Sequence, residues 1–400
     1  MEKNSVTKPV VGASFYLGIP GSTRHSAYDC VEIAADLGIQ HFFTTVQMPE
    51  ADIAGTLDEF RRIGVLCIRR ELRVMADAHP IAFRRVGGSV RDLEPLRELG
   101  VTDLRLDAGF DDEAVHELIG SAQKVGMSLV INASPQTPAS LRELKRLGLT
   151  LEGAVACHNY YPRMESGMSA RYLGAQANLL HGEGMLVMGF VASQMHHRYM
   201  TNEGLPTIER HRYVEPHRAF RELLVRRWCD QVYIGDQTDD EQELKQLVEA
   251  RDNPHLVLRV AVREDAHPAA AAIAFGRLHQ HLPQEFEVTY RSRGDRQRTG
   301  VAVVEPPRTP VERPRGTVAV DTVLYPRYAG EIHISKVDLP ADFRTTVVGR
   351  VIDDDLVLLD AIEPRTEFQL ESFRERRKDL KTGSTTVDDG VNPSTNMPGV

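Results

Sequence analysis

From Val10 to about Arg251, short runs of strand-forming residues alternate with helical patterns, and each pair occupies roughly 30 residues. Eight such units in about 245 residues predict an α/β fold, a (β/α)8 TIM barrel. A doubly wound open sheet is the alternative, although Gly18-Ile19-Pro20-Gly21-Ser22 only loosely resembles its Gly-rich phosphate turn. The predicted strands are Val11–Tyr16, His41–Val46, Leu72–Asp77, Asp103–Asp107, Ser128–Asn132, Gly153–Asn159, Leu186–Val191 and Gln231–Asp236.

Helix boundary signals lie between these strands. Thr137-Pro138 is an N-cap residue followed by proline at the first helical position. Leu99-Gly100 and Leu147-Gly148 are typical helix ends. These signals support alternating strands and helices over this part of the chain.

After about Asn253 the pattern changes to short strands separated by Pro, Gly and Arg, which predicts a smaller, mostly β domain. We expect an N-terminal tail over 1–9, a barrel over 10–252, a β domain over 253–372 and a disordered polar tail over 373–400. The predicted strands of the β domain are Phe286–Arg291, Gly300–Val304, Thr317–Asp321 and Glu331–Ser335.

Charge and cysteine content restrict the partners. A net charge of -9 with interspersed basic residues argues against nucleic acid or an anionic membrane as the main partner. No apolar stretch approaches the length of a membrane span, and the N-terminus lacks the apolar region of a signal peptide. Four well-separated cysteines without a C-x-x-C pair indicate reduced thiols in a cytoplasm.

In a (β/α)8 barrel the active site lies at the carboxyl ends of the strands, so polar residues there are the candidates. Three aspartates, Asp77, Asp107 and Asp236, end different strands, and Glu203 lies in the long seventh loop. Two carboxyl groups with separated pKa values can cleave a glycosidic bond. The alternative is that these aspartates cap helices or pair with Arg105. The other strand-end candidates are Ser14, Tyr16, Thr44, Thr45, Gln47, Arg105, Asn132, Ser134, His158 and Asn159.

Two loop arginines, Arg163 and Arg212, could bind a phosphate or carboxylate in bidentate fashion, or could be solvated surface residues. His158 could be a ligand or a core histidine. His196-His197 lacks the spacing of a metal site, and we expect neither a metal nor another cofactor. Cys157 is expected to pack as a small apolar residue.

Ordered motifs at successive strand ends resemble the MupG-type 6-phospho-N-acetylmuramidases. Tyr325-Pro-Arg-Tyr-Ala-Gly-Glu331 and Val347-Val-Gly349 resemble that family's cyclophilin-like β domain, so the likeness extends to about residue 370. The barrel motifs are Gly12-Ala-Ser-Phe-Tyr-Leu-Gly18, Phe43-Thr-Thr45, Leu104-Arg-Leu-Asp-Ala-Gly-Phe110, Ile131-Asn-Ala-Ser134, Cys157-His-Asn-Tyr-Tyr-Pro-Arg163, Glu203-Gly-Leu-Pro-Thr207 with His211-Arg212, and Val232-Tyr-Ile-Gly-Asp236.

The resemblance implies a cytoplasmic glycoside hydrolase of cell-wall recycling that cleaves a 6-phosphorylated N-acetylmuramic acid to N-acetylglucosamine linkage. We expect Asp107 and Asp236 to be the catalytic pair, with Glu203 as a reserve acid. A phosphorylated amino sugar is the expected ligand, and a homodimer is the expected protein partner, if any. The expected binding residues are Tyr16, Thr45, Asp77, Arg105, Asn132, His158, Asn159, Tyr161, Arg163, His211 and Arg212.

The chain departs from the family pattern at the end of strand seven. Ser193-Gln194 stands where the family carries a Gly-Asp pair, Tyr199-Met200 replaces a Gly-Pro step, and Thr346 occupies a position that is often Asn. Two other functions therefore stay open. One is a sugar-phosphate sensor that binds without hydrolysis, and the other is a lyase or isomerase acting on a sugar phosphate.

Overall fold

The structure is a computed structural model that describes residues 9–18, 23–45, 53–80, 83, 86–107, 109–197, 201–293 and 304–373. Gln47, Tyr199-Met200, the expected tails, most of the loose phosphate-turn motif and most of the expected strand Gly300–Val304 lie outside the described residues. Within the described part of the chain, no helix is both long and apolar enough to cross a membrane.

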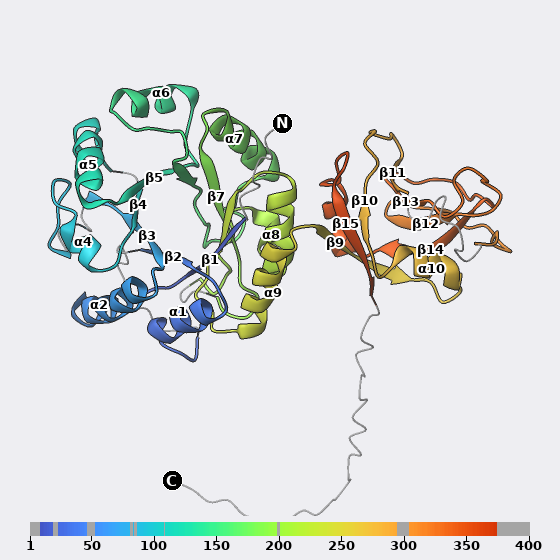
Figure 1. Cartoon of the computed structure of the whole chain (residues 1–400), viewed down its shortest axis with the longest axis horizontal. Coiled ribbons are helices and arrows are strands. Elements are labelled where there is room, and N and C mark those ends of the chain that lie inside the picture. The colour runs from blue at the N-terminus through green and yellow to red at the C-terminus, as the bar shows by residue number, and fades with distance from the viewer. Residues whose placement is uncertain are drawn as a thin grey trace, which may run out of the picture.

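Eight parallel strands close into a barrel, each hydrogen-bonded to the next and β8 back to β1, which confirms the predicted fold (Figure 1). The strand starts agree with prediction to within two residues, and most strands end earlier than expected. The strands are β1 Val10–Ser14, β2 His41–Thr45, β3 Arg73–Ala78, β4 Asp103–Leu106, β5 Ser128–Asn132, β6 Val155–Cys157, β7 Leu186–Val191 and β8 Gln231–Ile234.

The helices surround the barrel, and their ends follow local sequence signals. Thr137 forms a capping box with Ser140, and Pro138 begins the helix, as predicted. Asp111 caps the helix after β4, which ends at Gly126 in a left-handed conformation. The helices are α1 Ala27–Asp36, α2 Ile53–Arg69, α4 Glu94–Glu98, α5 Asp112–Val125, α6 Pro138–Arg146, α7 Ala170–Gly182, α8 Pro216–Val225 and α9 Glu241–Asp252, with a 3-10 turn at Glu209–His211.

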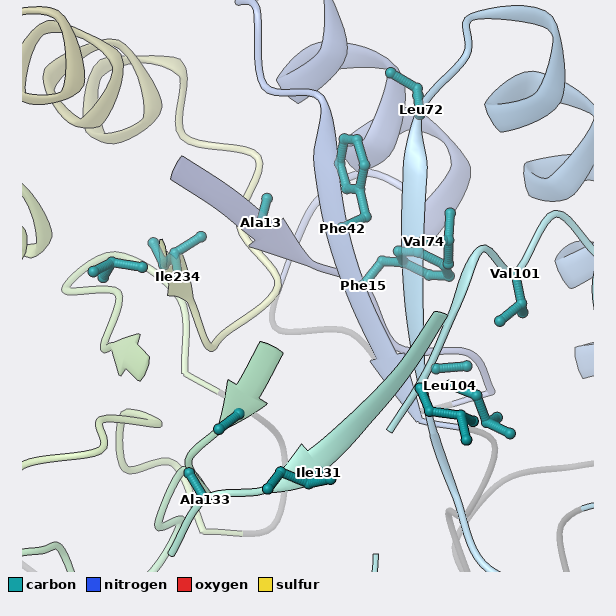
Figure 2. Close-up of a cluster of buried hydrophobic side chains, with 14 of the residues drawn as sticks. Ala13, Phe15, Phe42, Leu72, Val74, Val101, Leu104, Ile131, Ala133 and Ile234 are labelled. Atoms are coloured by element: carbon teal, nitrogen blue, oxygen red, sulfur yellow. The ribbon is translucent and has the colours of Figure 1, made fainter. Parts of the chain in front are cut away.

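Alternate strand residues build two separate apolar layers. Phe42, Val74 and Leu104 point outward and pack in the layer between strands and helices (Figure 2). Phe43 and Met75, their chain neighbours on β2 and β3, point inward and belong to a cluster inside the barrel. Because side chains alternate along a strand, this division also shows which strand-end residues face the barrel axis.

The second unit is a seven-stranded sheet with the order β10-β15-β9-β14-β12-β13-β11. All neighbours are antiparallel except β15 and β9. The predicted strand Thr317–Asp321 is confirmed as β12, whereas β9, β10, β14 and β15 were not predicted as strands. The strands are β9 Leu256–Val262, β10 Leu278–Gln280, β11 Thr289–Ser292, β12 Thr317–Asp321, β13 Ile332–Ser335, β14 Thr345–Val351 and β15 Glu367–Phe373, accompanied by α10 Pro268–Ala274 and α11 Leu356–Leu359.

A buried carboxylate joins the two units. Asp355, which is 1% exposed, accepts a hydrogen bond of 3.0 Å from Arg218 of α8 and bonds from Arg259 of β9. Arg259 also forms an ion pair with Glu215, the residue before α8. Removal of either arginine would leave a buried charge partly unpaired, so these contacts fix the sheet against the barrel.

Candidate active site

Side-chain alternation brings polar residues of five neighbouring strands into the barrel mouth. On β4, Leu104 and Leu106 pack outward, so Arg105 and Asp107 face inward. The inward-facing residues of the interior cluster on β2, β3, β5 and β6 are each followed, two residues later, by a polar side chain. These polar residues are Thr45, Asp77, Asn132 and Asn159.

Arg105 lies at the centre of this polar group and is only 3% exposed. Its Nη1 donates a 2.6 Å hydrogen bond to Asp77 Oδ1 and lies 4.0 Å from Asp107 Oδ1. Its Nη2 donates to the side-chain oxygen of Asn159. The expected alternative, pairing of a strand-end aspartate with Arg105, is thus present, and it brings two carboxyl groups together.

Asp77 and Asp107 differ in environment. The Asp77 side chain is 16% exposed and that of Asp107 is 34% exposed. Burial raises the pKa of Asp77, and although Arg105 opposes this, the negative charge of Asp107 raises the pKa again. One arginine can balance only one of the two carboxylates. Of the two carboxyl groups, Asp77 is therefore the one whose pKa is raised by burial, and Asp107 is the more accessible.

Aromatic side chains of the barrel interior adjoin this polar group. Tyr160, the chain neighbour of Asn159, lies edge-on to Phe43, Phe190 and Tyr16, with ring centroids 5.9, 5.3 and 6.4 Å away. Tyr16 is anchored because its hydroxyl donates a 2.6 Å bond to the carbonyl of Gly235. Phe43 and Phe190 are each 1% exposed, whereas Tyr160 is half-buried and can offer its ring to the apolar face of a sugar.

Asn132 and Thr45 contribute differently to this mouth. Asn132 Oδ1 accepts a bond from the Ser134 amide, and its side-chain NH2 has no partner among the residues described. That group is available to a ligand. Thr45 is buried at the end of β2 and already has an interaction partner.

His158 faces away from the axis and is fully buried. Its Nδ1 lies 3.4 Å from Ser134 Oγ, and its Nε2 has no hydrogen-bond partner. Burial, reinforced by the charge of Arg105, lowers the pKa of His158 to about 3. Of the two readings of His158, the structure favours a neutral core histidine that packs behind the site.

Arg212 does not bind ligand in this geometry, which corrects the expectation from sequence. It is 1% exposed, and all five of its N–H donors are used. Its Nε and Nη2 donate to the carboxylate of Glu209, at 2.8 and 2.6 Å. The remaining donors bind the carbonyl oxygens of Tyr161, Gly204 and Arg163. Arg212 is therefore a structural residue that shapes the sixth loop.

Glu209 and Arg212 together form a clamp that holds the sixth loop. The sequence did not predict the part played by Glu209. Its carboxylate also accepts bonds from the amides of Glu165 and Gly167, and the bond from Arg212 is the main cause that lowers the pKa of Glu209 to about 2. The three-residue spacing of Glu209 and Arg212 is the signal that could have revealed the pair.

Arg163 and Tyr161 are the ligand candidates that the clamp presents. The Arg163 side chain is exposed, and its guanidinium has no partner in the described part of the chain. Tyr161 is half-buried, and its backbone is held on both sides by Pro206 and Arg212. Of the two loop arginines, Arg163 alone can receive an anion without breaking existing bonds.

Two further residues expected in the site, His211 and Asp236, are buried and bonded to the surrounding protein. His211 is 2% exposed and its Nε2 lies 2.9 Å from Glu222 of α8, so the structure places it away from the mouth. Asp236 is 0% exposed, and its Oδ2 accepts bonds of 3.0 Å from the amides of Ser193 and Leu205. Asp236 thereby ties both ends of the seventh loop, so this geometry gives it a structural role, and its choice as a catalytic group stays a prediction.

Glu203 is partly exposed in the seventh loop. Its Oε2 accepts a 2.8 Å bond from the hydroxyl of Tyr213. No contact joins it to the Arg105 group in the described structure, so it stays a reserve candidate.

The side-chain amide of Gln194 is fixed by hydrogen bonds to the backbone of the seventh loop. Nε2 donates to the carbonyl oxygens of Ala192, Ser193 and Arg212. A carboxylate in the same orientation would face these carbonyl oxygens without protons to donate. The amide is therefore matched to the local backbone of this chain.

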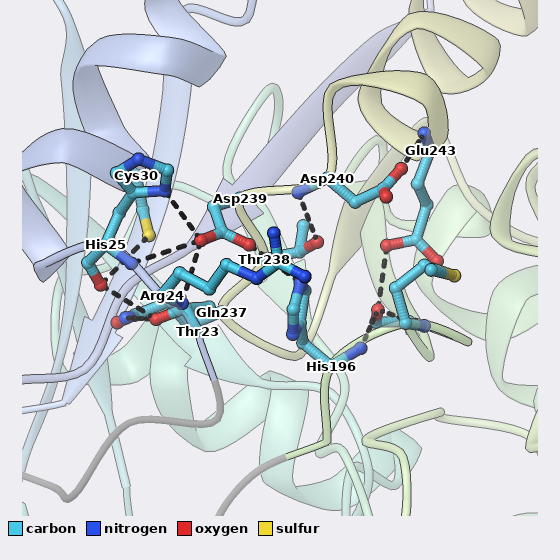
Figure 3. A network of polar contacts seen from close by, with 12 residues as sticks. Thr23, Arg24, His25, Cys30, His196, Gln237, Thr238, Asp239, Asp240 and Glu243 are labelled. Carbon is cyan, nitrogen blue, oxygen red and sulfur yellow. Dashed lines mark hydrogen bonds and ion pairs between the residues drawn. The ribbon is translucent and has the colours of Figure 1, made fainter.

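A second polar network joins loops one, seven and eight at the rim (Figure 3). Asp239 accepts bonds from His25 Nδ1 at 2.8 Å and from the amides of Arg24 and His25, and it pairs with His196 Nε2 at 2.7 Å. His196 thus has a carboxylate partner. Among the described residues, no group of three or more His, Cys, Asp or Glu side chains could hold a metal ion.

Comparison with known proteins covers nearly the whole chain. Residues 11–249 match a family described as 6-phospho-N-acetylmuramidase, N-terminal, and residues 256–371 match its C-terminal counterpart. No curated protein matches the chain.

Two solved structures are similar over most of their length. A conserved protein of unknown function from a locus in Enterococcus faecalis is 30% identical, with a TM-score of 0.69 over 91% of this chain and 96% of that one. An uncharacterized B. cereus protein is 24% identical, with a TM-score of 0.77 over 91% of this chain and all of that one. These structures support the fold of both units.

Proposed function

The chain belongs to the 6-phospho-N-acetylmuramidase family of glycosidases, and we propose that it hydrolyses the bond between a 6-phosphorylated N-acetylmuramic acid and N-acetylglucosamine. The observation that carries the proposal is the inward-facing group of Asp77, Arg105 and Asp107 at the mouth of the barrel. We further propose that this reaction serves cell-wall recycling in the cytoplasm, in keeping with four free, buried cysteines.

Asp77 is proposed as the general acid. Burial raises its pKa, which favours the protonated carboxyl group that can transfer a proton to the glycosidic oxygen as the bond to the anomeric carbon breaks. Arg105, which remains hydrogen-bonded to Asp77, stabilises the carboxylate that this transfer leaves. Asp77 thus takes the place of Asp236 in the catalytic pair expected from the sequence.

Asp107 is proposed as the second catalytic carboxyl group, on the other side of the bond. One nitrogen of Arg105 lies 2.6 and 4.0 Å from the two carboxylates, so they are close neighbours. Glycosidases use carboxyl separations of roughly 5 to 9.5 Å. Asp107 can stabilise the positive charge at the anomeric carbon and accept a proton from the attacking water. The oxygen and second proton of that water become the anomeric hydroxyl of the muramic acid product, and transfer of the proton from Asp107 back to Asp77 through solvent restores the starting state.

Recognition is assigned to the exposed and unpaired groups. The free guanidinium of Arg163 can bind the phosphate or the lactyl carboxylate. Tyr160 and Tyr161 can lie against apolar sugar faces, and the free amide of Asn132 can donate to a hydroxyl.

The test is turnover of the phosphorylated disaccharide by Asp77→Asn, Asp107→Asn and a matched control, Asp112→Asn. Asp112 is exposed in the first turn of α5, directly after the β4 loop. We expect losses of at least about 100-fold for the first two variants and wild-type rates for the control. Full activity of both strand-end variants would refute the assignment. Substrate binding without products by the wild-type chain would favour a sensor instead.

A further inference from the structure

A cavity of about 550 Å³ lies at the N-terminal end of the barrel, opposite the mouth. Residues that begin strands line it, among them His41, Arg73, Asp103 and Gln231, and the side chain of Tyr233 closes its inner end. Packed inward-facing side chains such as Phe43, Met188 and Phe190, each no more than 1% exposed, fill the barrel above it. The cavity is therefore separate from the Arg105 group, and it does not depend on the proposed function.

The hydroxyl of Tyr233 has no hydrogen-bond partner in the described structure, although the residue is only 2% exposed. Its ring is fixed between Phe190 and His41, with centroids 6.4 and 6.3 Å away, and a side chain at Gly12 would meet the ring at 2.5 Å. Buried tyrosine hydroxyls usually find a partner. Here the ring cannot turn away, so the hydroxyl remains directed at the cavity.

Other polar side chains around this hydroxyl also have hydrogen-bond donors or acceptors that no described residue uses. Arg73 uses Nε and Nη2 for Asp103, which leaves both protons of Nη1 unused. No hydrogen bond is recorded for the imidazole of His41 or the side-chain amide of Gln231 in the described part of the chain. Burial lowers the pKa of His41, so this ring is a neutral donor and acceptor.

The charge balance selects the class of ligand. Arg73 is matched by Asp103, and the exposed Glu152 adds a negative charge at the cavity wall. An anion would therefore be repelled, whereas a neutral molecule with many hydroxyl groups could use donors and acceptors of both kinds. The volume lies within the range of small-molecule sites, roughly 300 to 1,000 Å³.

We propose that this cavity is a second ligand site, which binds a neutral polyol of monosaccharide size through Tyr233, Gln231 and Arg73. The bound sugar supplies the missing partner of the Tyr233 hydroxyl. Its apolar face packs against the side chains of Met75 and Val130, which also line the cavity.

Calorimetry with N-acetylglucosamine and glucose, with glucose 6-phosphate as the anionic counterpart, tests the proposal. We expect the neutral sugars to bind and the phosphorylated one to bind more weakly. Tyr233→Phe should weaken neutral-sugar binding about three- to tenfold, whereas Tyr28→Phe, in helix α1 and outside the cavity lining, should leave this binding unchanged. A soaked crystal should show the sugar beside Tyr233 and Gln231.

Because Tyr233 loses no intramolecular bond on substitution, Tyr233→Phe should unfold at the same denaturant concentration as the wild type. This separates loss of a ligand contact from loss of the fold. Failure of both neutral sugars to bind at their solubility limit would overturn the proposal. Binding that Tyr233→Phe leaves unchanged, or a preference for the phosphorylated sugar, would also overturn it.

Discussion

Replacement of the two loop arginines should have opposite effects on stability and binding. Arg212→Met removes all five donors of a buried guanidinium and leaves Glu209 without its ionic partner. Because the Glu209 side chain is 34% exposed, water can partly replace the ion pair, and the lost hydrogen bonds of the buried guanidinium should destabilise the protein by about 1 to 3 kcal/mol. Arg163→Met removes an exposed side chain with no side-chain contact among the described residues, so its effect should stay within about 0.5 kcal/mol.

Denaturant unfolding of both variants measures the difference in stability. Kinetics with the phosphorylated disaccharide measure the difference in substrate binding. Arg163→Met should raise KM because the anion loses its cation, with a stability like that of the wild type. Arg212→Lys is the matched control for charge, since lysine has three donors in place of five and should recover only part of the stability. The reasoning would be refuted if Arg212→Met were as stable as the wild type, or if Arg163→Met left KM unchanged.

The remaining predictions concern pH and backbone space. His158 has a pKa of about 3 in the folded protein, against about 6.5 in an unfolded chain. The contribution of neutral His158 to the free energy of unfolding is therefore full above pH 6.5. It is lost as the pH falls toward 3, by about 1.4 kcal/mol per pH unit. The stability difference between wild type and His158→Gln should therefore shrink on acidification, and a constant difference would contradict the assignment. Asp107→Asn removes a neighbouring negative charge, so NMR titration should show a lower pKa for Asp77. Gly167→Ala would place a methyl group 2.6 Å from Glu209 Oε2, so it should raise KM through displacement of the sixth loop, which a crystal structure would show.

Much of the barrel could be predicted because its signal is local and periodic. Each strand is a short run of residues that fit a pleated, buried surface, and each helix begins or ends at residues such as Thr137 or Gly126. The β-domain strands were harder to predict. β14 and β15 are recognised mainly through long-range pairing with β12 and β9, which a local pattern does not record.

The candidate site was predicted in part because strand ends meet at one place. The structure places Asp77, Arg105 and Asn159 together, as their positions at the carboxyl ends of β3, β4 and β6 suggest. Asp236 differs because it follows outward-facing Ile234 by two residues, and alternation places it behind the wall. Side-chain alternation, applied to each strand end, would have separated these cases from sequence.

Loop residues could not be assigned in the same way. Arg163 and Arg212 are both arginines in βα loops, and the local signal that distinguishes them is the three-residue spacing between Glu209 and Arg212. Only the folded contacts show that Arg212 is enclosed by Glu209 and three carbonyl groups, whereas Arg163 is exposed. The relation depends on two loops that meet in space although they are almost fifty residues apart.

The most direct measurement of the central claim compares two leaving groups. A 4-nitrophenyl glycoside of 6-phospho-N-acetylmuramic acid needs no proton on departure, whereas the N-acetylglucosamine of the disaccharide does. Asp77→Asn should therefore lose at least about 100-fold with the disaccharide and keep most of its activity with the aryl glycoside, and Asp107→Asn should lose activity with both. Equal losses of Asp77→Asn with both substrates would contradict an acid at this position, and no loss with either would contradict the site.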